Sequence, residues 1–196
     1  MHSAIGRLTR VQLAAYIKYN DLGHTRATVE RYIGLLERLF LIRRLPAWHR
    51  NSAKRLVKAP KLHFCDSGLV TALTRLTTEE WMRQQAKFGH LLESFALQQL
   101  IAQSGWLNQP VDFWHYRDKD KVEVDIVITQ GSRIWGVEVK SAKNIHSSDG
   151  HGLQRLADQA GSSAFQSGVV LYDGESISPI QEKPKIYAVP FSELWS

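Results

Sequence analysis

Two strand-like runs near the middle of the chain decide its fold: Val122-Glu-Val-Asp-Ile-Val-Ile128 and Ile134-Trp-Gly-Val-Glu-Val-Lys140. In each run polar and apolar residues alternate, and alternate side chains of a strand lie on the same face. Glu138 and Lys140 therefore share one face of the second run. If the two strands pair, Asp125 from the first run meets them. Carboxylates beside an ammonium group are suited to holding a divalent cation against a phosphodiester.

The same alternation predicts which residues of the first run face the core. It places Glu123 and Asp125 on one face, and Val124 and Ile126 on the other. A simpler interpretation is an ordinary half-exposed strand on which the Glu-x-Lys residues form an ion pair, and such pairs contribute ~1 kcal/mol or less. The pattern of these runs leaves both interpretations open.

The segments around the two runs predict a mixed sheet with helices. Turn residues at 118–121 and 130–132 predict hairpins between the first three strands. A helix between the third and fourth strands predicts a right-handed crossover and a parallel fourth strand. The expected elements are a helix at 88–101, strands at 111–117, 122–129 and 134–141, a helix at 152–160, strands at 167–172 and 186–189, and a short helix at 191–195.

The helix expected at 88–101 carries a carboxylate close to its apolar stripe. Phe88, Leu92 and Phe95 mark that stripe at helical spacing, and Glu93 should lie near its edge. A carboxylate in this position either reaches solvent or contributes to a polar site beneath the helix. The helix alone does not decide between these two roles.

The composition indicates a soluble globular protein. The chain has 196 residues, of which 43% are hydrophobic and 22% charged, so it can form one domain or two small ones. It has neither an apolar run of the ~20 residues that span a bilayer nor a secretory signal, and we expect it to be cytoplasmic. The single Cys65 excludes an internal disulfide and a multi-cysteine zinc site, and Asp66 beside it is expected to cap a short helix that reaches Leu73.

Positive charge is concentrated in the first third of the chain. Residues 1–61 hold 13 Lys or Arg and 3 acidic residues, a balance of +10. Residues 62–196 hold 12 and 16, a balance of −4, and the two balances sum to the net charge of +6. Such asymmetry points to a polyanionic partner, with a basic surface that only maintains solubility as the alternative.

The basic segment has the pattern of a winged helix. A helix at 9–19 and a turn at 20–23 lead into a second helix at 25–40, on which Val29, Ile33, Leu36 and Phe40 form an apolar stripe, as in a helix-turn-helix. Extended segments at 39–45 and 54–58 then predict a basic hairpin, the wing, which would follow phosphates. The DNA contacts expected from this segment are Arg26, Arg31, Arg43, Arg44, Arg50, Lys54, Arg55 and Lys58.

The order helix, three strands, helix, strand resembles the restriction-endonuclease-like superfamily. The resemblance rests on Glu93 in the helix, Asp125 on the second strand and Glu138-Val-Lys140 on the third, although Val124 stands where the superfamily motif has proline. It implies an α/β protein with a small N-terminal winged helix at 1–61, followed by a restriction-endonuclease-like mixed-sheet domain flanked by helices at 62–196.

A second resemblance covers nearly the whole chain. Segments 54–69, 91–95, 116–120, 123–127 and 137–142 are similar to a family of uncharacterised domains that form the C-terminal part of bacterial and archaeal AAA-type ATPases. The resemblance implies a P-loop ATPase module as a partner, in cis or in trans. The chain lacks the Gly-x-x-x-x-Gly-Lys-Ser/Thr motif of that module, so we expect no ATPase activity and interpret the chain as a C-terminal fragment or a stand-alone relative.

The leading functional hypothesis is metal-dependent hydrolysis of DNA. Asp125, Glu138 and the Val139 carbonyl would hold Mg²⁺ or Mn²⁺, Lys140 would orient a water molecule or stabilise the transition state, and Glu93 would complete the site. The alternative is a non-catalytic DNA-binding or regulatory module that positions an ATPase. A third alternative is a winged helix that contacts protein, and two further metal ligands, considered with less weight, are His146 and His151.

Overall fold

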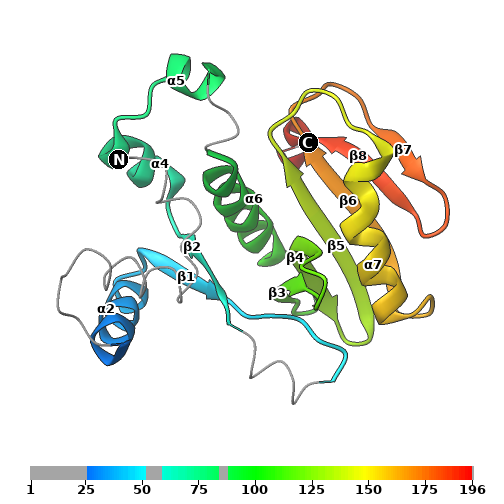
Figure 1. Cartoon of the computed structure of the whole chain (residues 1–196), viewed down its shortest axis with the longest axis horizontal. Coiled ribbons are helices and arrows are strands. Elements are labelled where there is room, and N and C mark those ends of the chain that lie inside the picture. Colours follow the sequence, from blue (N-terminus) through cyan, green and yellow to red (C-terminus); the bar gives the residue numbers. More distant parts are fainter. Residues whose placement is uncertain (1–25, 52–58, 84–87, 196) are drawn as a thin grey trace. The chain divides into compact units, whose positions relative to one another are not determined.

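The structure is a computed structural model that describes residues 26–51, 59–83 and 88–195. The chain divides into two compact units (Figure 1). Of the described residues, 26–45, 59–83 and 88–95 form the first unit, and 46–51 and 96–195 form the sheet unit. Among the described helices, none has the length and apolar character needed to cross a bilayer.

The first unit combines short helices with a two-stranded sheet. Strand β1, Ile42–Leu45, pairs antiparallel with strand β2, Lys61–Phe64, so that Ile42 lies opposite Phe64. The predicted returning strand at 54–58 lies outside the described residues. The helices of this unit are α2 at Arg26–Arg38, α4 at Ser67–Thr74, α5 at Thr78–Arg83 and the first part of α6 at Gly89–Ser104.

Helix α2 follows its prediction at the start and departs from it at the end. Val29 and Ile33 are buried, whereas Leu36 and Phe40, the rest of the predicted stripe, are exposed. The helix ends early because Phe40 adopts a left-handed φ of 56°. The N–H of Phe40 then donates to the carbonyl of Glu37, and the N–H of Leu41 donates to that of Leu36. This pattern is a Schellman motif, which satisfies the last carbonyls of a helix.

Helix α4 begins at the predicted cap, Asp66. Helix α6, in contrast, buries a different face from the predicted apolar stripe. The carboxylate of Asp66 accepts a hydrogen bond from the N–H of Leu69 at 3.0 Å and so caps α4. On α6 the buried residues are Glu93, Ser94, Ala96 and Leu97, rather than the predicted stripe. Glu93 therefore belongs to the buried face of the helix and not to its edge. Helix α5 had no counterpart among the predicted elements.

The sheet unit contains a six-stranded mixed sheet in the order β3-β4-β5-β6-β8-β7. The first three strands are antiparallel neighbours, β5, β6 and β8 are parallel, and β7 joins β8 antiparallel. The mixed α/β architecture and the parallel β5–α7–β6 connection are thus confirmed. The strands are β3 at Asp112–Arg117, β4 at Glu123–Gln130, β5 at Arg133–Lys140, β6 at Phe165–Tyr172, β7 at Ser178–Gln181 and β8 at Ile186–Pro190.

Helix α7, His151–Ala160, covers one face of this sheet and contacts β4, β5 and β6 (Figure 1). It follows a 3₁₀ helix, η3, at Ser147–Gly150, and the sheet unit closes with a second one, η4, at Phe191–Trp195. Leu153 and Leu156 of α7 are fully buried against the sheet. Burying a leucine side chain contributes ~1.5–3 kcal/mol, so this face of α7 is what attaches the helix.

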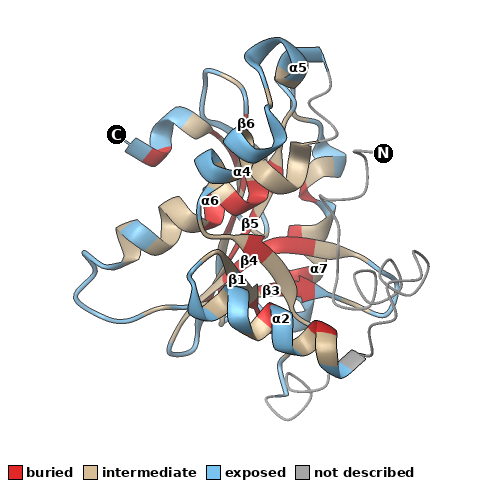
Figure 2. Ribbon diagram, turned by 90° about the vertical axis from the view of Figure 1, so that its left-hand side faces the viewer, coloured by how far each residue is buried: buried red, intermediate tan, exposed pale blue. Residues whose placement is uncertain are grey.

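Two close backbone approaches position α7. A Cβ on Gly136 of β5 would lie 2.6 Å from a Leu153 methyl carbon, and a Cβ on Gly152 would lie 2.4 Å from the carbonyl oxygen of Glu123. Glycine is needed at residue 152 because a backbone oxygen cannot move aside as a side-chain end can. The start of α7 is therefore held directly against the start of β4. Figure 2 shows the buried residues of the sheet unit gathered along β4, β5 and α7.

The two compact units do not follow the predicted division at residues 61 and 62. That division falls inside β2, whose residues pair with β1 on both sides of it. Residues 46–51, which precede it, lie in the sheet unit. The assignment of two functional domains stays a prediction.

Candidate functional site

Strand β4 contains a β-bulge at the residues that were expected to form a site. Along β3 the pairing advances two residues from Trp114 to Tyr116, while along β4 it advances three, from Val127 to Val124. Asp125 and Ile126 therefore both lie opposite His115. Bulges re-aim side chains and are frequent beside functional sites.

The bulge corrects the prediction of strict alternation along β4. Alternation would put Val124 and Val127 on opposite faces, yet both belong to the core cluster beneath α7. The bulge inserts one extra residue between them, which interrupts the alternation, so that two residues three apart reach the same face. Ile126, next to Val127 in regular register with β5, therefore faces away from Val124, and the predicted grouping of Val124 with Ile126 on one face is wrong.

Asp125 is a buried carboxylate that bonds to the neighbouring strand. Its residue is 7% exposed, and its Oδ2 accepts a hydrogen bond from the backbone N–H of Val139 at 3.0 Å. Val139 lies on β5 between Glu138 and Lys140. The bond therefore holds the Asp125 carboxylate next to the Glu-x-Lys segment, as the pairing of the two runs predicted.

Glu138 and Lys140 form a direct ion pair on β5. The Lys140 Nζ lies 3.1 Å from Oε1 of Glu138, and the two side chains are 34% and 15% exposed. Burial alone would lower the pKa of Lys140. The carboxylates of Glu138, Asp125 and Asp149 together outweigh burial, so the pKa of Lys140 is raised above its usual value.

Asp149 is the residue of this neighbourhood that the sequence-based site did not include. It lies on η3 just before α7, and its Oδ2 accepts a hydrogen bond from the backbone N–H of His146 at 2.8 Å. Asp149 is the third residue of η3, and its bond back to the N–H of His146 is half of a capping box, in a segment where the sequence predicted no helix. Its carboxylate is among those that raise the pKa of Lys140.

The three predicted sheet residues lie near an edge where ligands commonly bind. Glu138 and Lys140 are at the carboxyl end of β5, beside Val170 and Tyr172 of the parallel strand β6. In mixed and parallel sheets, ligands bind outside the carboxyl ends of the strands, and helix N-termini there favour anions. The start of α7 meets this end of the sheet at β4.

Glu93 lies in the first unit and has partners of its own there. Its Oε1 is 3.0 Å from Nδ1 of His90, and its Oε2 is 3.8 Å from the Lys61 ammonium. Next to it on α6, the Ser94 hydroxyl lies 3.2 Å from Nδ1 of His63, and both residues are buried. The role of Glu93 in the site of Asp125 and Glu138 stays a prediction.

The predicted metal ligands form no dense cluster among the described residues. Within residues 26–51, 59–83 and 88–195, no group of three or more His, Cys, Asp or Glu side chains is placed to hold a metal ion. The two side chains expected to bind metal are Asp125 and Glu138, with the Val139 carbonyl as a backbone ligand. His146 and His151, also considered as ligands, are exposed at the start of η3 and α7.

The predicted DNA-contact residues differ in their surroundings. Arg44 is bound within the first unit, with its Nε 2.8 Å from Glu37 and its Nη1 3.3 Å from Glu30. This pairing ties β1 to α2 and offsets the charge of Arg44, and its contact with DNA stays a prediction. Arg31, Arg43 and Arg50 are exposed, whereas Lys54, Arg55, Lys58 and the side chain of Arg26 lie outside the described residues.

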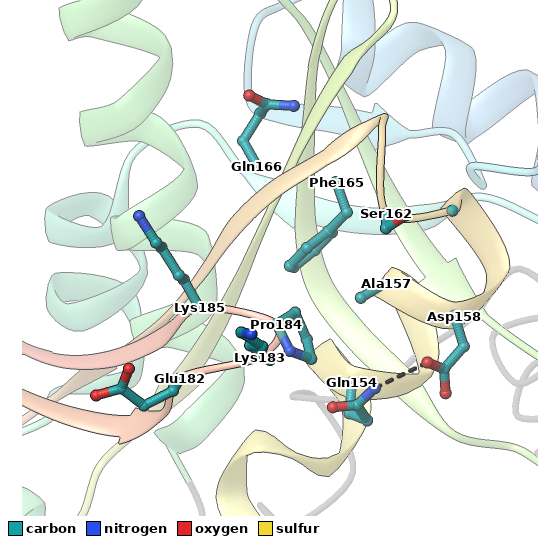
Figure 3. A pocket seen from close by; sticks show the side chains of 11 residues that line it. Gln154, Ala157, Asp158, Ser162, Phe165, Gln166, Glu182, Lys183, Pro184 and Lys185 are labelled. Carbon is teal, nitrogen blue, oxygen red and sulfur yellow. Dashed lines mark hydrogen bonds between the residues drawn. The ribbon is translucent and has the colours of Figure 1, made fainter.

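A separate hollow lies at the other end of α7 (Figure 3). It has a volume of ≈ 500 Å³ and lies between the last turn of α7, the start of β6 and the turn from β7 to β8. Phe165 and Pro184 line it, with Lys183 on its rim and the Gln154 amide donating to Asp158 at 2.8 Å. It contains none of the predicted site residues.

Comparison with known proteins links the chain to uncharacterised relatives. It is 28% identical over 176 residues to Uncharacterized protein Mb2031c of Mycobacterium bovis and, equally, to Uncharacterized protein Rv2008c of Mycobacterium tuberculosis. The match covers 89% of this chain and 37% of each relative, so the chain spans little more than a third of their length. No solved structure matches the chain.

Two family patterns match different parts of the chain. Residues 3–80 match the family described as Domain of unknown function (DUF8612). Residues 88–194, more than half of the chain, match the family described as Domain of unknown function (DUF4143). The chain thus belongs to the DUF4143 family.

Proposed function

We propose that the sheet unit is a metal-dependent phosphodiester hydrolase module that acts on DNA. The observation that carries the proposal is the hydrogen bond from the Val139 N–H to Asp125, which holds this carboxylate beside the Glu138–Lys140 ion pair. Support also comes from the order of α6, three antiparallel strands, α7 and a parallel strand, which is that of the restriction-endonuclease-like superfamily.

The chemistry of the donor groups fits a hard divalent cation. Asp125 and Glu138 supply carboxylate oxygens, and the Val139 carbonyl is available on the same segment of β5 as a third donor. Mg²⁺ commonly binds one or two carboxylates and keeps several water ligands, which suits so small a set. When bound, Mg²⁺ or Mn²⁺ would acidify a water ligand and offset the charge that develops on the phosphate.

Lys140 supplies the positive charge that hydrolysis of an anion requires. Its ammonium is protonated at neutral pH, and the carboxylates around it raise its pKa further. An ammonium with rotatable donors can orient an attacking water and stabilise charge on a phosphate oxygen. The ion pair with Glu138 holds the ammonium at the carboxylates before substrate arrives.

Basic residues of the N-terminal segment 1–61 would supply the contacts to the DNA backbone. Arg31, Arg43 and Arg50 are exposed and come from the segment with a charge balance of +10. Arginines bound to phosphates contribute affinity that does not depend on base sequence. A winged helix in this segment remains part of the proposal.

Cleavage of plasmid and branched DNA with Mg²⁺ or Mn²⁺ tests the proposal. Asp125→Asn and Glu138→Gln should each lower the cleavage rate by at least roughly 10²-fold, the usual scale for removing an electrostatic catalytic group. Glu123→Gln is a matched control. Glu123 lies on the same strand as Asp125, but it pairs with Arg117 of β3 at 3.1 Å and is not a proposed metal ligand. Cleavage that persists in both site variants, or is absent with both metals, contradicts the proposal.

A second candidate is a non-catalytic DNA-binding or regulatory module that positions an ATPase. Domains of the DUF4143 family are commonly found with AAA-type ATPases. The chain covers 37% of the length of its mycobacterial relatives, which leaves room there for a further module. Retention of DNA without cleavage under either metal would favour this candidate over the hydrolase.

A further inference from the structure

Residues 46–48, which we call the strap, lie along the outer edge of β3. The N–H of Trp48 donates to the carbonyl of His115 at 2.6 Å, and the N–H of His115 donates to the carbonyl of Pro46 at 2.9 Å. Ala47 forms a parallel bridge with the same residue. The strap therefore occupies both backbone bonding groups of His115 on the open side of the edge strand.

The strap is anchored in the core of the sheet unit. Trp48 is 2% exposed, and its ring lies 6.1 Å from that of Tyr116 at an interplanar angle of 55°. Ala47 has no exposed surface, and Trp48 belongs to the same core cluster as Val124 and Val127. Tilted aromatic pairs at this separation are favourable beyond the area they bury.

The strap and the bulge meet at one residue. His115, which the strap bonds on one side, faces Asp125 and Ile126 of the bulge on the other. His115 is itself buried, 4% exposed. The backbone of β3 is thus fixed from outside at the point where β4 carries its extra residue.

We propose that Trp48 is a positioning residue for the candidate site, and that it acts through the strap and His115 to keep Asp125 directed at the N–H of Val139. A bulge leaves a residue out of the ladder, and the competing arrangement is a regular register. Because a one-residue slip turns side chains to the other face, regular pairing would redirect the Asp125 carboxylate and break its bond to the N–H of Val139. The strap opposes that slip by holding His115.

Amide hydrogen exchange in the full chain tests the positioning directly. In Trp48→Phe, which keeps an apolar ring, we expect the protection of the Val139 amide to fall at least fivefold more than that of the β6 amides. Leu156→Ala is the matched control, because Leu156 belongs to the same core cluster but lies on α7. In the control, Val139 and β6 should lose protection by the same factor.

Equal loss at Val139 and β6 in Trp48→Phe would overturn the proposal. Trp48→Leu provides the same comparison if the phenylalanine variant retains too much of the packing. The Val139 readout depends on no metal and no substrate, so it stands even if the hydrolase proposal fails.

A second measurement tests whether Trp48 also affects metal binding, and this part of the inference rests on the proposed function. Mn²⁺ titration by calorimetry should show an affinity at least fivefold weaker in Trp48→Phe than in the unaltered chain. In Asp125→Asn the same tryptophan change should have no further effect, because the group that it positions is gone. An equal loss in both backgrounds overturns the positioning role, whereas absence of Mn²⁺ binding in the unaltered chain counts against the hydrolase alone.

Discussion

Glu138 and Lys140 compensate each other's charge at the carboxyl end of β5, and that compensation depends on pH. Their atoms are 3.1 Å apart, and both side chains are partly withdrawn from solvent. Exposed pairs of this kind contribute little because water screens them, whereas partial burial strengthens the attraction and adds a cost of desolvation. The raised pKa of Lys140 shows that attraction prevails over desolvation here.

The first prediction concerns stability at high pH. The folded state binds the Lys140 proton more tightly than the unfolded state, whose pKa lies near 10.5. The stabilisation is therefore complete below about pH 10.5 and is lost as the pH rises through the higher pKa of the folded state. Urea denaturation from pH 9 to 11.5 should show a smaller decline in the free energy of unfolding for Glu138→Gln than for the unaltered chain.

Comparing Glu138→Gln with the unaltered chain separates the titration of Lys140 from that of Tyr116, whose pKa is also raised. Burial, followed by the Asp118 carboxylate, raises the pKa of Tyr116, so this tyrosine also loses stabilisation at high pH. Its contribution is the same in both proteins and cancels in the difference. Parallel declines in the two proteins would show that Glu138 does not stabilise the Lys140 ammonium.

At the scale of elements, α7 packs against β4 at Gly152, where a side chain would clash with the backbone of Glu123. The second prediction is that Gly152→Ala destabilises the protein by ~1–3 kcal/mol, the usual cost of overpacking. Alanine would normally stabilise a helix by about 1 kcal/mol relative to glycine. The clash of the new Cβ with the Glu123 carbonyl, 2.4 Å away, should outweigh that gain.

Thermal unfolding measured by circular dichroism checks the sign of this change. Gln159→Ala is the control, because Gln159 is exposed on the same helix and its change tests helix propensity alone. A stabilising effect of Gly152→Ala would mean that the start of α7 does not pack tightly on β4.

Element order could be predicted from the sequence, but local register could not. Alternation in residues 122–128 and 134–140 was strong enough to identify β4 and β5, and a helical segment after them fixed the parallel connection to β6. The bulge was invisible because Val124, Ile126 and Val127 are all apolar and buried, so any register satisfies the pattern. Strand β7 was missed because it is a short edge strand that contains Pro179.

The residues of the candidate site also divide into those that could be predicted from the sequence and those that could not. Asp125, Glu138 and Lys140 follow from side-chain type and the pairing of two neighbouring strands, which are local properties. Asp149 reaches the neighbourhood through the packing of η3 and α7, which depends on contacts between residues distant in the sequence. Glycine at residue 152 permits that packing, but the sequence does not reveal which backbone it will approach.

At the scale of the whole molecule, residues 46–48 lie before residue 61 in the chain yet belong to the sheet unit, with Trp48 in its core. The third prediction is that Trp48→Ala costs ~3–5 kcal/mol, the range for removing a buried aromatic side chain. A chain that begins at residue 62 should be destabilised at least as much, because it lacks the whole strap. Urea denaturation of both variants gives the comparison, and a shortened chain as stable as the full one would contradict the role of Trp48 in the core.

The last prediction tests whether arginines of the basic segment, which accounts for the net charge of +6, contact DNA phosphates. Binding of a protein to DNA releases counterions, and the logarithm of the affinity falls with the logarithm of salt concentration by ~0.9 for each phosphate contacted. Replacing Arg31, Arg43 and Arg50 together with glutamine should reduce that slope by up to ~2.7 if each contacts one phosphate. Arg44→Gln should change the slope little, because Arg44 is bound to Glu30 and Glu37.

Fluorescence anisotropy with a labelled duplex at several salt concentrations provides the measurement. Arg117→Gln adds a control for loss of positive charge in the sheet unit, where Arg117 pairs with Glu123. If the triple variant keeps the slope of the unaltered chain, Arg31, Arg43 and Arg50 do not contact phosphates. The charge of these three arginines would then have no measurable part in binding the duplex, and phosphate contacts would have to come from other basic residues of the segment.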